Sequence, residues 1–115
     1  MCVKIIKIKP DCHLKKRVID IISEKMYLTQ KGEVRLLKFK ALDNLKYINH
    51  TVSTRIGGVS SKDGLKSLNL GTYTADLIEN VRENYRLFCS SAGYDVKRLV
   101  LGNQTHSLNV RYATS

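Results

Sequence analysis

The sequence has few of the residues on which small proteins rely for cross-links and rigid turns. Its 115 residues include no tryptophan, one proline and three cysteines. The cysteines are Cys2, Cys12 and Cys89, an odd set without a Cys-x-x-Cys pair. A disulfide framework is therefore an improbable source of stability, and reduced thiols are the simpler interpretation. A hydrophobic share of 43% still suits one small folded domain.

Long hydrophobic runs are absent as well. No stretch approaches the length that a bilayer-spanning helix requires. Lysines interrupt the apolar residues of the first nine positions, so the N-terminus lacks the unbroken apolar segment of a secretory signal. We therefore expect a cytoplasmic protein without a membrane partner.

Acidic residues are scarce, since 10 Asp and Glu stand against 20 Lys and Arg and give a net charge of +10. Residues 1–40 hold most of this excess, with 11 basic and four acidic residues. A basic surface can attract nucleic acid or an anionic substrate. Aromatic residues do not alternate with the basic ones in a base-stacking pattern, however. A solvated basic face is favoured, and a nucleic-acid partner is not expected.

The first two thirds of the chain read as strands followed by a loop. Alternating apolar residues at positions 3–8 predict a short strand, and helical spacing predicts a helix over 14–22. Residues 27–29 and 34–39 predict a β-hairpin in which Gly32 supplies the positive φ. A strand is expected over 48–54. The glycine-, serine- and asparagine-rich segment 55–73 predicts a long loop, which is usually functional or mobile.

The clearest helix follows this loop. Val81, Tyr85, Phe88 and Ala92 form one apolar stripe, and Gly93 is the expected left-handed terminator. Asp76 and Glu79 match a capping box, so Asp76 is the predicted N-cap. Two further strands are predicted over 99–102 and 108–113, with residue 106 in the connection between them.

Three short motifs, each weak by itself, together carry the strongest signal. In chain order they are Thr54-Arg55-Ile56-Gly57-Gly58-Val59-Ser60, Ser67-Leu68-Asn69-Leu70-Gly71 and Asn103-Gln104-Thr105-His106-Ser107. With a helix between the second and the third, they resemble the beginning of the YfiH/YlmD family. Its members are also called laccase-domain or polyphenol oxidase proteins, and the better-understood ones resemble zinc-dependent purine nucleoside phosphorylases.

The resemblance runs from about Met26 to the end of the chain and has implications for the fold. It implies an α/β fold with mixed β-sheets flanked by helices, of which residues 26–115 are the N-terminal portion. Residues 1–25 have no counterpart in the family and form a basic N-terminal extension. Such a partial sheet exposes strand edges, so self-association is expected.

The resemblance also implies a metal ligand. In the family the histidine that matches His106 binds the catalytic metal, usually zinc, for which a neutral imidazole is a suitable donor. The family takes its other two ligands from an Ala-Asp-Cys and a His-x-Gly-Trp motif, and neither occurs in these 115 residues. No metal is therefore expected to bind this chain by itself. Copper oxidase chemistry fits less well than zinc, since three scattered histidines cannot supply its ligands.

Three more residues are candidate contacts for phosphate and a nucleoside. Arg55 beside Gly57 and Gly58 suits an anion, because arginine pairs two phosphate oxygens and glycine N–H groups can come close to them. Asn69 can donate and accept hydrogen bonds at a purine or ribose edge. Gln104 is a further candidate to line the cleft, as is His50. An ordinary exposed arginine beside a turn and an asparagine capping a turn remain open alternatives.

The resemblance implies phosphorolysis of adenosine, inosine or methylthioadenosine, and deamination of adenosine. With two of three metal ligands absent, the chain is expected to be inactive alone. The alternative is a non-catalytic fragment, or a binding or structural module that uses its basic N-terminal surface. One departure from the family pattern is the loss of a glycine and an acid before the helix, where Ala75, Asp76 and Leu77 stand in place of Gly-Asp-Asp.

Overall fold

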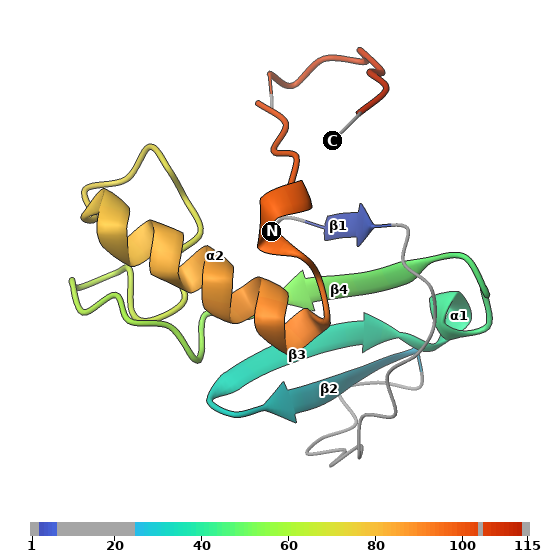
Figure 1. Ribbon diagram of the computed structural model, residues 1–115, viewed down its shortest axis with the longest axis horizontal. Helices are drawn as coiled ribbons and strands as arrows, with labels where there is room; N and C mark the ends of the chain where they lie inside the picture. Colours follow the sequence, from blue (N-terminus) through green and yellow to red (C-terminus); the bar gives the residue numbers. More distant parts are fainter. Residues whose placement is uncertain (1–2, 7–24, 104, 114–115) are drawn as a thin grey trace.

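The computed structural model describes residues 3–6, 25–103 and 105–113. Four strands form one sheet in the order β1-β4-β3-β2, and every described pairing is antiparallel. The strands are β1 (Val3–Ile6), β2 (Met26–Lys31), β3 (Val34–Phe39) and β4 (Asn49–Ser53). The sheet is joined by the short α1 (Lys40–Asp43) and the long α2 (Ile78–Ala92), as Figure 1 shows. The predicted α/β class is confirmed.

The β-hairpin at residues 26–39 forms where its sequence pattern placed it. Strands β2 and β3 pair from Met26 with Phe39 to Lys31 with Val34. Only Gly32 and Glu33 separate the strands, and Gly32 has φ +61°. A glycine at the first position of a two-residue turn matches the twist of the flanking strands. The turn therefore sets the register in which Val34 and Leu36 face the core.

Strand β1 brings the start of the chain into the same sheet. It pairs with β4, with Val3 opposite Val52 and Ile6 opposite Asn49. The predicted strand is confirmed over residues 3–6, whereas the helix predicted over 14–22 lies outside the described residues. The division of the chain into residues 1–25 and 26–115 stays a prediction.

Helix α2 packs against β3 and encloses the core between them. The core cluster unites the two elements with the loop and the segment after the helix; its members are Val34, Leu36, Leu68, Phe88, Cys89, Ala92 and Tyr94. Truncation of a buried phenylalanine such as Phe88 typically costs about 3–5 kcal/mol. The predicted stripe is thus the packed face of the helix, although Tyr85 is only partly buried.

The end of α2 was predicted correctly, but its beginning was not. Gly93 ends the helix with φ +77°, and its N–H reaches the carbonyls of Cys89 and Ser90. The N-cap is Leu77, not Asp76, and no side chain caps the helix. The capping box fails because the Asp76 carboxylate is engaged by the preceding loop, as described below.

The strands predicted over 99–102 and 108–113 are wrong. After α2 the chain forms the short 3₁₀ helix η1 (Val96–Arg98), and its described residues then continue without regular structure. Figure 1 shows this segment, in orange and red, leading away from the sheet and α2. Apolar alternation alone does not make a strand, since a strand also needs a neighbour for its backbone hydrogen bonds.

Candidate functional site

The loop at residues 55–73 is folded back on itself around Arg55. The Arg55 carbonyl accepts hydrogen bonds from the backbone N–H groups of Ser67 and Leu68, at 2.7 and 2.9 Å. Its guanidinium Nε donates to the carbonyl of Lys66 at 3.0 Å. The loop has a first limb at residues 55–60 and a second limb at residues 66–71. A bridge between Ser60 and Ser67 joins the two limbs. Arg55 is therefore held at the loop surface by both its backbone and its side chain.

The two glycines after Arg55 have a structural task. Their N–H groups both donate to the hydroxyl of Ser67, Gly57 at 3.0 Å and Gly58 at 3.2 Å. A Cβ on Gly57 would lie 2.3 Å from the Cα of Val34, and one on Gly58 would lie 2.2 Å from the carbonyl oxygen of Ser67. Gly57 thus allows the loop to lie against β3, and Gly58 allows close approach to Ser67. The Ser67 hydroxyl occupies the N–H groups that the sequence suggested for an anion.

Asn69 lies on the second limb of the same loop, where its side chain stabilises a turn. Its amide N–H groups donate to Thr74 and to the Asp76 carboxylate, and its Oδ1 accepts from the N–H of Gly71 at 2.9 Å. Both donors are therefore used within the chain, as the turn-capping alternative predicted. One Oδ1 lone pair remains for any ligand.

Asp76 connects this limb to the start of α2. Its carboxylate accepts hydrogen bonds from the Ser60 hydroxyl, the Asn69 and Asn80 amides and the Leu77 N–H. The bond from Ser60 contributes most, followed by that from Asn69, and together they lower the pKa of Asp76 to about 2. The carboxylate is therefore ionised at neutral pH and acts as an acceptor for the loop.

Asn84 is the residue of this region that the sequence pattern did not single out. It lies on the buried face of α2 and is fully enclosed. Its Oδ1 accepts from the Val59 N–H at 2.8 Å, while its Nδ2 donates to the Ser60 hydroxyl and the Asn69 carbonyl. The available signal was a polar residue within an apolar stripe, since Asn84 lies three positions after Val81 and four before Phe88.

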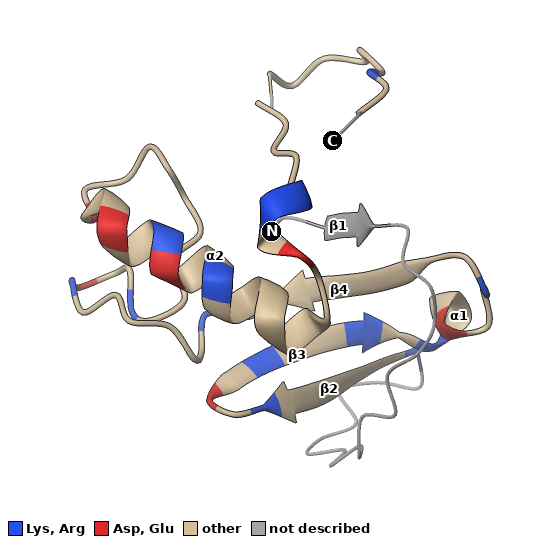
Figure 2. Ribbon diagram, in the orientation of Figure 1, with Lys and Arg blue, Asp and Glu red and all other residues tan. Residues whose placement is uncertain are grey.

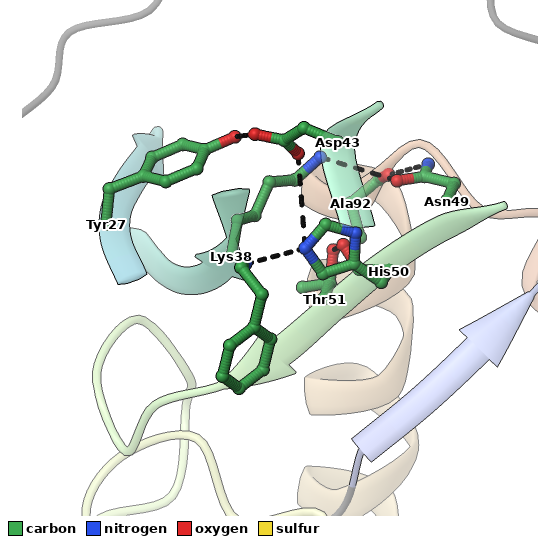
Figure 3. Close-up of polar contacts among 8 residues, drawn as sticks. Tyr27, Lys38, Asp43, Asn49, His50, Thr51 and Ala92 are labelled. Atoms are coloured by element: carbon green, nitrogen blue, oxygen red, sulfur yellow. Dashed lines mark hydrogen bonds and ion pairs between the residues drawn. The ribbon is translucent and has the colours of Figure 1, made fainter. Parts of the chain in front are cut away.

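His50, considered as a residue lining a cleft, is enclosed in the sheet instead. It lies on β4 at 2% exposure, and its Nε2 accepts the backbone N–H of Phe39 at 2.6 Å. Burial lowers the pKa of His50, although Asp43, whose carboxylate is 4.0 Å from Nε2, acts in the opposite direction. Asp43 also accepts the hydroxyl of Tyr27 (Figure 3). This cluster joins α1 to the sheet and offers His50 no open face.

His106 is not brought together with Arg55 and Asn69. It is exposed in the irregular C-terminal segment, with φ +55°, and no hydrogen bond joins it to the loop within the described residues. Gln104 lies outside the described residues. No three His, Cys, Asp or Glu side chains cluster as metal ligands in the described part of the chain, and Cys89 is in the core. The described residues therefore do not by themselves make a zinc site.

The remaining predictions on partners concern charge and membranes. Figure 2 shows the basic residues of the described part spread over the strands, α2 and the loops rather than gathered on one element. Within residues 3–6, 25–103 and 105–113, no helix has the length and apolar character needed to cross a bilayer.

Comparison with known proteins identifies relatives at the level of sequence. A family model described as multi-copper polyphenol oxidoreductase laccase matches residues 49–115. A purine nucleoside phosphorylase of Bacteroides thetaiotaomicron is 35% identical over 75 residues. That alignment covers 65% of this chain but only 27% of the relative, so the chain spans about a quarter of the relative's length. No solved structure matches the chain.

The matched region contains the three motifs, the loop and α2. It begins at β4 and includes Arg55, Asn69 and His106. The chain therefore belongs to the laccase-domain family of multi-copper polyphenol oxidoreductases, the YfiH/YlmD family that its motifs predicted.

Proposed function

We propose that this chain carries part of a purine nucleoside phosphorylase-like site. The observation that carries the proposal is its 35% identity, over 75 residues, to a protein named purine nucleoside phosphorylase. The family is also described as a multi-copper polyphenol oxidoreductase, and the phosphorylase interpretation is preferred here because it follows the name of the aligned relative.

In this proposal Arg55 contacts inorganic phosphate. It is exposed, its Nε is held by the Lys66 carbonyl, and an arginine guanidinium can still pair phosphate oxygens through its terminal N–H groups. Asn69 would present its remaining acceptor to the nucleoside, and Gln104 would contact the same ligand. His106 would provide one imidazole for zinc.

The same proposal holds that the 115-residue chain does not catalyse phosphorolysis alone. A catalytic zinc normally has three protein ligands and an open position. Of the three residues that would match the family's metal ligands, these 115 residues contain only His106. Loss of one member of a catalytic unit usually abolishes the rate instead of trimming it. The expected activity of this chain is therefore ligand binding without turnover.

The proposal is tested by titrating the purified chain with inorganic phosphate and following chemical shifts or heat. Arg55→Ala should weaken binding, whereas Arg98→Ala, which removes the same charge from exposed η1, should not. In parallel, inosine or adenosine is incubated with phosphate, zinc and the chain, and release of the base is measured. Turnover that His106→Ala removes would contradict the claim of inactivity.

A non-catalytic module with a basic surface is the second candidate, and the net charge of +10 favours it. It predicts a different titration result. General attraction of anions would fall equally in Arg55→Ala and Arg98→Ala and would disappear at high salt. Equal losses in the two variants would therefore replace the phosphorylase-like proposal with this one.

A further inference from the structure

Asn84 lies at the junction of three segments that are distant in sequence. From the buried face of α2 it reaches the first limb of the loop at Val59 and Ser60 and the second limb at Asn69. Its Oδ1 would be 2.5 Å from a Cβ on Gly58, so the loop backbone lies directly against the amide. One side chain thus links both limbs of the loop to the helix.

The burial of Asn84 makes its hydrogen bonds necessary. A polar side chain at 0% exposure must satisfy its hydrogen bonds to offset the loss of water, and an apolar residue here would leave the Val59 N–H and the Asn69 carbonyl without this partner. A fully satisfied buried amide selects one geometry for the groups around it. Asn84 has one acceptor contact and two donor contacts, each 2.8 or 2.9 Å long.

The geometry that Asn84 selects extends to Arg55. The limb that it holds through the Asn69 carbonyl also contains Ser67 and Leu68, whose N–H groups bind the Arg55 carbonyl. The preceding Lys66 carbonyl accepts the guanidinium Nε. A shift of this limb therefore displaces both the backbone and the side chain of the arginine.

We infer that Asn84 is a positioning residue that orients Arg55 for an anionic ligand of the phosphate class. Asn84 does not touch the ligand, and it acts by holding the limb that carries the acceptor of the Arg55 side chain. The inference rests on the proposed phosphate contact. It adds that Asn84, a residue of α2 about 30 positions after Arg55, determines the orientation of the Arg55 side chain.

The test compares phosphate binding by the full chain with that of Asn84→Ala and of the milder Ser60→Ala, which removes one partner of the amide. Asn84→Ala should bind phosphate about tenfold more weakly, a change within the usual range for coupled sites. Ser60→Ala should cause a smaller loss, because the bond from Asn84 to the Asn69 carbonyl remains. Val52→Ala is the control, because it truncates a buried side chain on β4, outside the loop at residues 55–73. It should retain wild-type affinity at a comparable loss of melting temperature.

A double-mutant cycle separates positioning from general damage. If Asn84 acts through Arg55, Asn84→Ala should cause no further loss in an Arg55→Ala background. Wild-type affinity in Asn84→Ala and Ser60→Ala, or additive losses in the double variant, would overturn the inference and leave the phosphate contact standing. A wild-type chain that does not bind phosphate would instead remove the proposed function, and the inference with it.

Discussion

At the scale of single residues, the ionisation of Asp76 follows from its hydrogen bonds. Asp76 accepts from four donors, and the first of these, the Ser60 hydroxyl, contributes most to its low pKa of about 2. Its ordinary value is 3.8. Because the folded-state pKa lies below the unfolded one, the contribution of Asp76 to stability is complete above about pH 4 and is lost as the pH falls towards 2.

We predict that Asp76→Asn removes this part of the acid sensitivity. Urea unfolding between pH 2 and 6 should show a steeper loss of stability for the wild type than for the variant in the window from about 4 to 2. Asp63→Asn is the matched control, because its carboxylate makes only an exposed contact with Lys66. Parallel curves for the wild type and Asp76→Asn would contradict the prediction.

His50 gives a second pH dependence at higher pH. Burial lowers its folded-state pKa below the ordinary 6.5, so the unfolded chain binds a proton more readily than the folded one. Stability should therefore decrease as the pH falls below about 6.5, and His50→Gln should reduce that slope. Equilibrium unfolding at several pH values measures it.

The control for His50 is His106→Gln, which alters an exposed histidine. That variant should reproduce the wild-type slope between pH 7 and 5. Equal slopes in the wild type and His50→Gln would show that protonation of His50 does not affect folding in this range.

At the scale of elements, the approach of the loop to β3 depends on one glycine. Gly57 has φ +107°, and an added Cβ would meet the backbone of Glu33 and Val34 at 2.3–2.6 Å. Gly64, in the same loop, has φ +80° but open space around it. The two positions separate the cost of backbone conformation from the cost of a clash.

We predict that Gly64→Ala costs about 1–2 kcal/mol, the price of a left-handed conformation alone. Gly57→Ala should cost more, on the order of 4 kcal/mol, because backbone must also move. Chemical denaturation of both variants measures the difference. Equal losses would mean that the loop does not lie against β3 in solution.

The elements also differ in how well local sequence predicts them. The hairpin and α2 follow from Gly32, Gly93 and the stripe around Phe88, because the signals that form them lie within a few residues. The prediction of Asp76 as the N-cap was wrong because its carboxylate binds Ser60, 16 positions away. The strand predicted from the apolar alternation at residues 108–113 was wrong because no partner strand pairs with this segment within the described residues.

At the scale of the whole molecule, residues 105–113 form a C-terminal segment in which every described residue is exposed. Leu108, Val110 and Tyr112 are 100%, 91% and 103% exposed. Alternating apolar side chains on an unpaired segment promote association between chains. A net charge of +10 opposes this through repulsion.

We predict that the purified chain self-associates through this segment at moderate salt. Light scattering should give a mass above the 13.1 kDa of one chain. A variant that combines Leu108→Ser, Val110→Ser and Tyr112→Ser should return towards that mass. The control Tyr73→Ser, at an exposed loop position, should not change the mass. A monodisperse wild-type monomer would contradict the prediction.

The sequence by itself determined the family, the hairpin, the core face of α2 and its end at Gly93, because motifs, periodicity and turn residues are local. Tertiary structure alone decided the functions of the polar side chains. It placed Ser67 on the glycine N–H groups, enclosed His50 between β3 and α1, and made Asn84 the link between both limbs of the loop. Hydrogen bonds between distant segments depend on which groups packing brings together, and no local pattern records that.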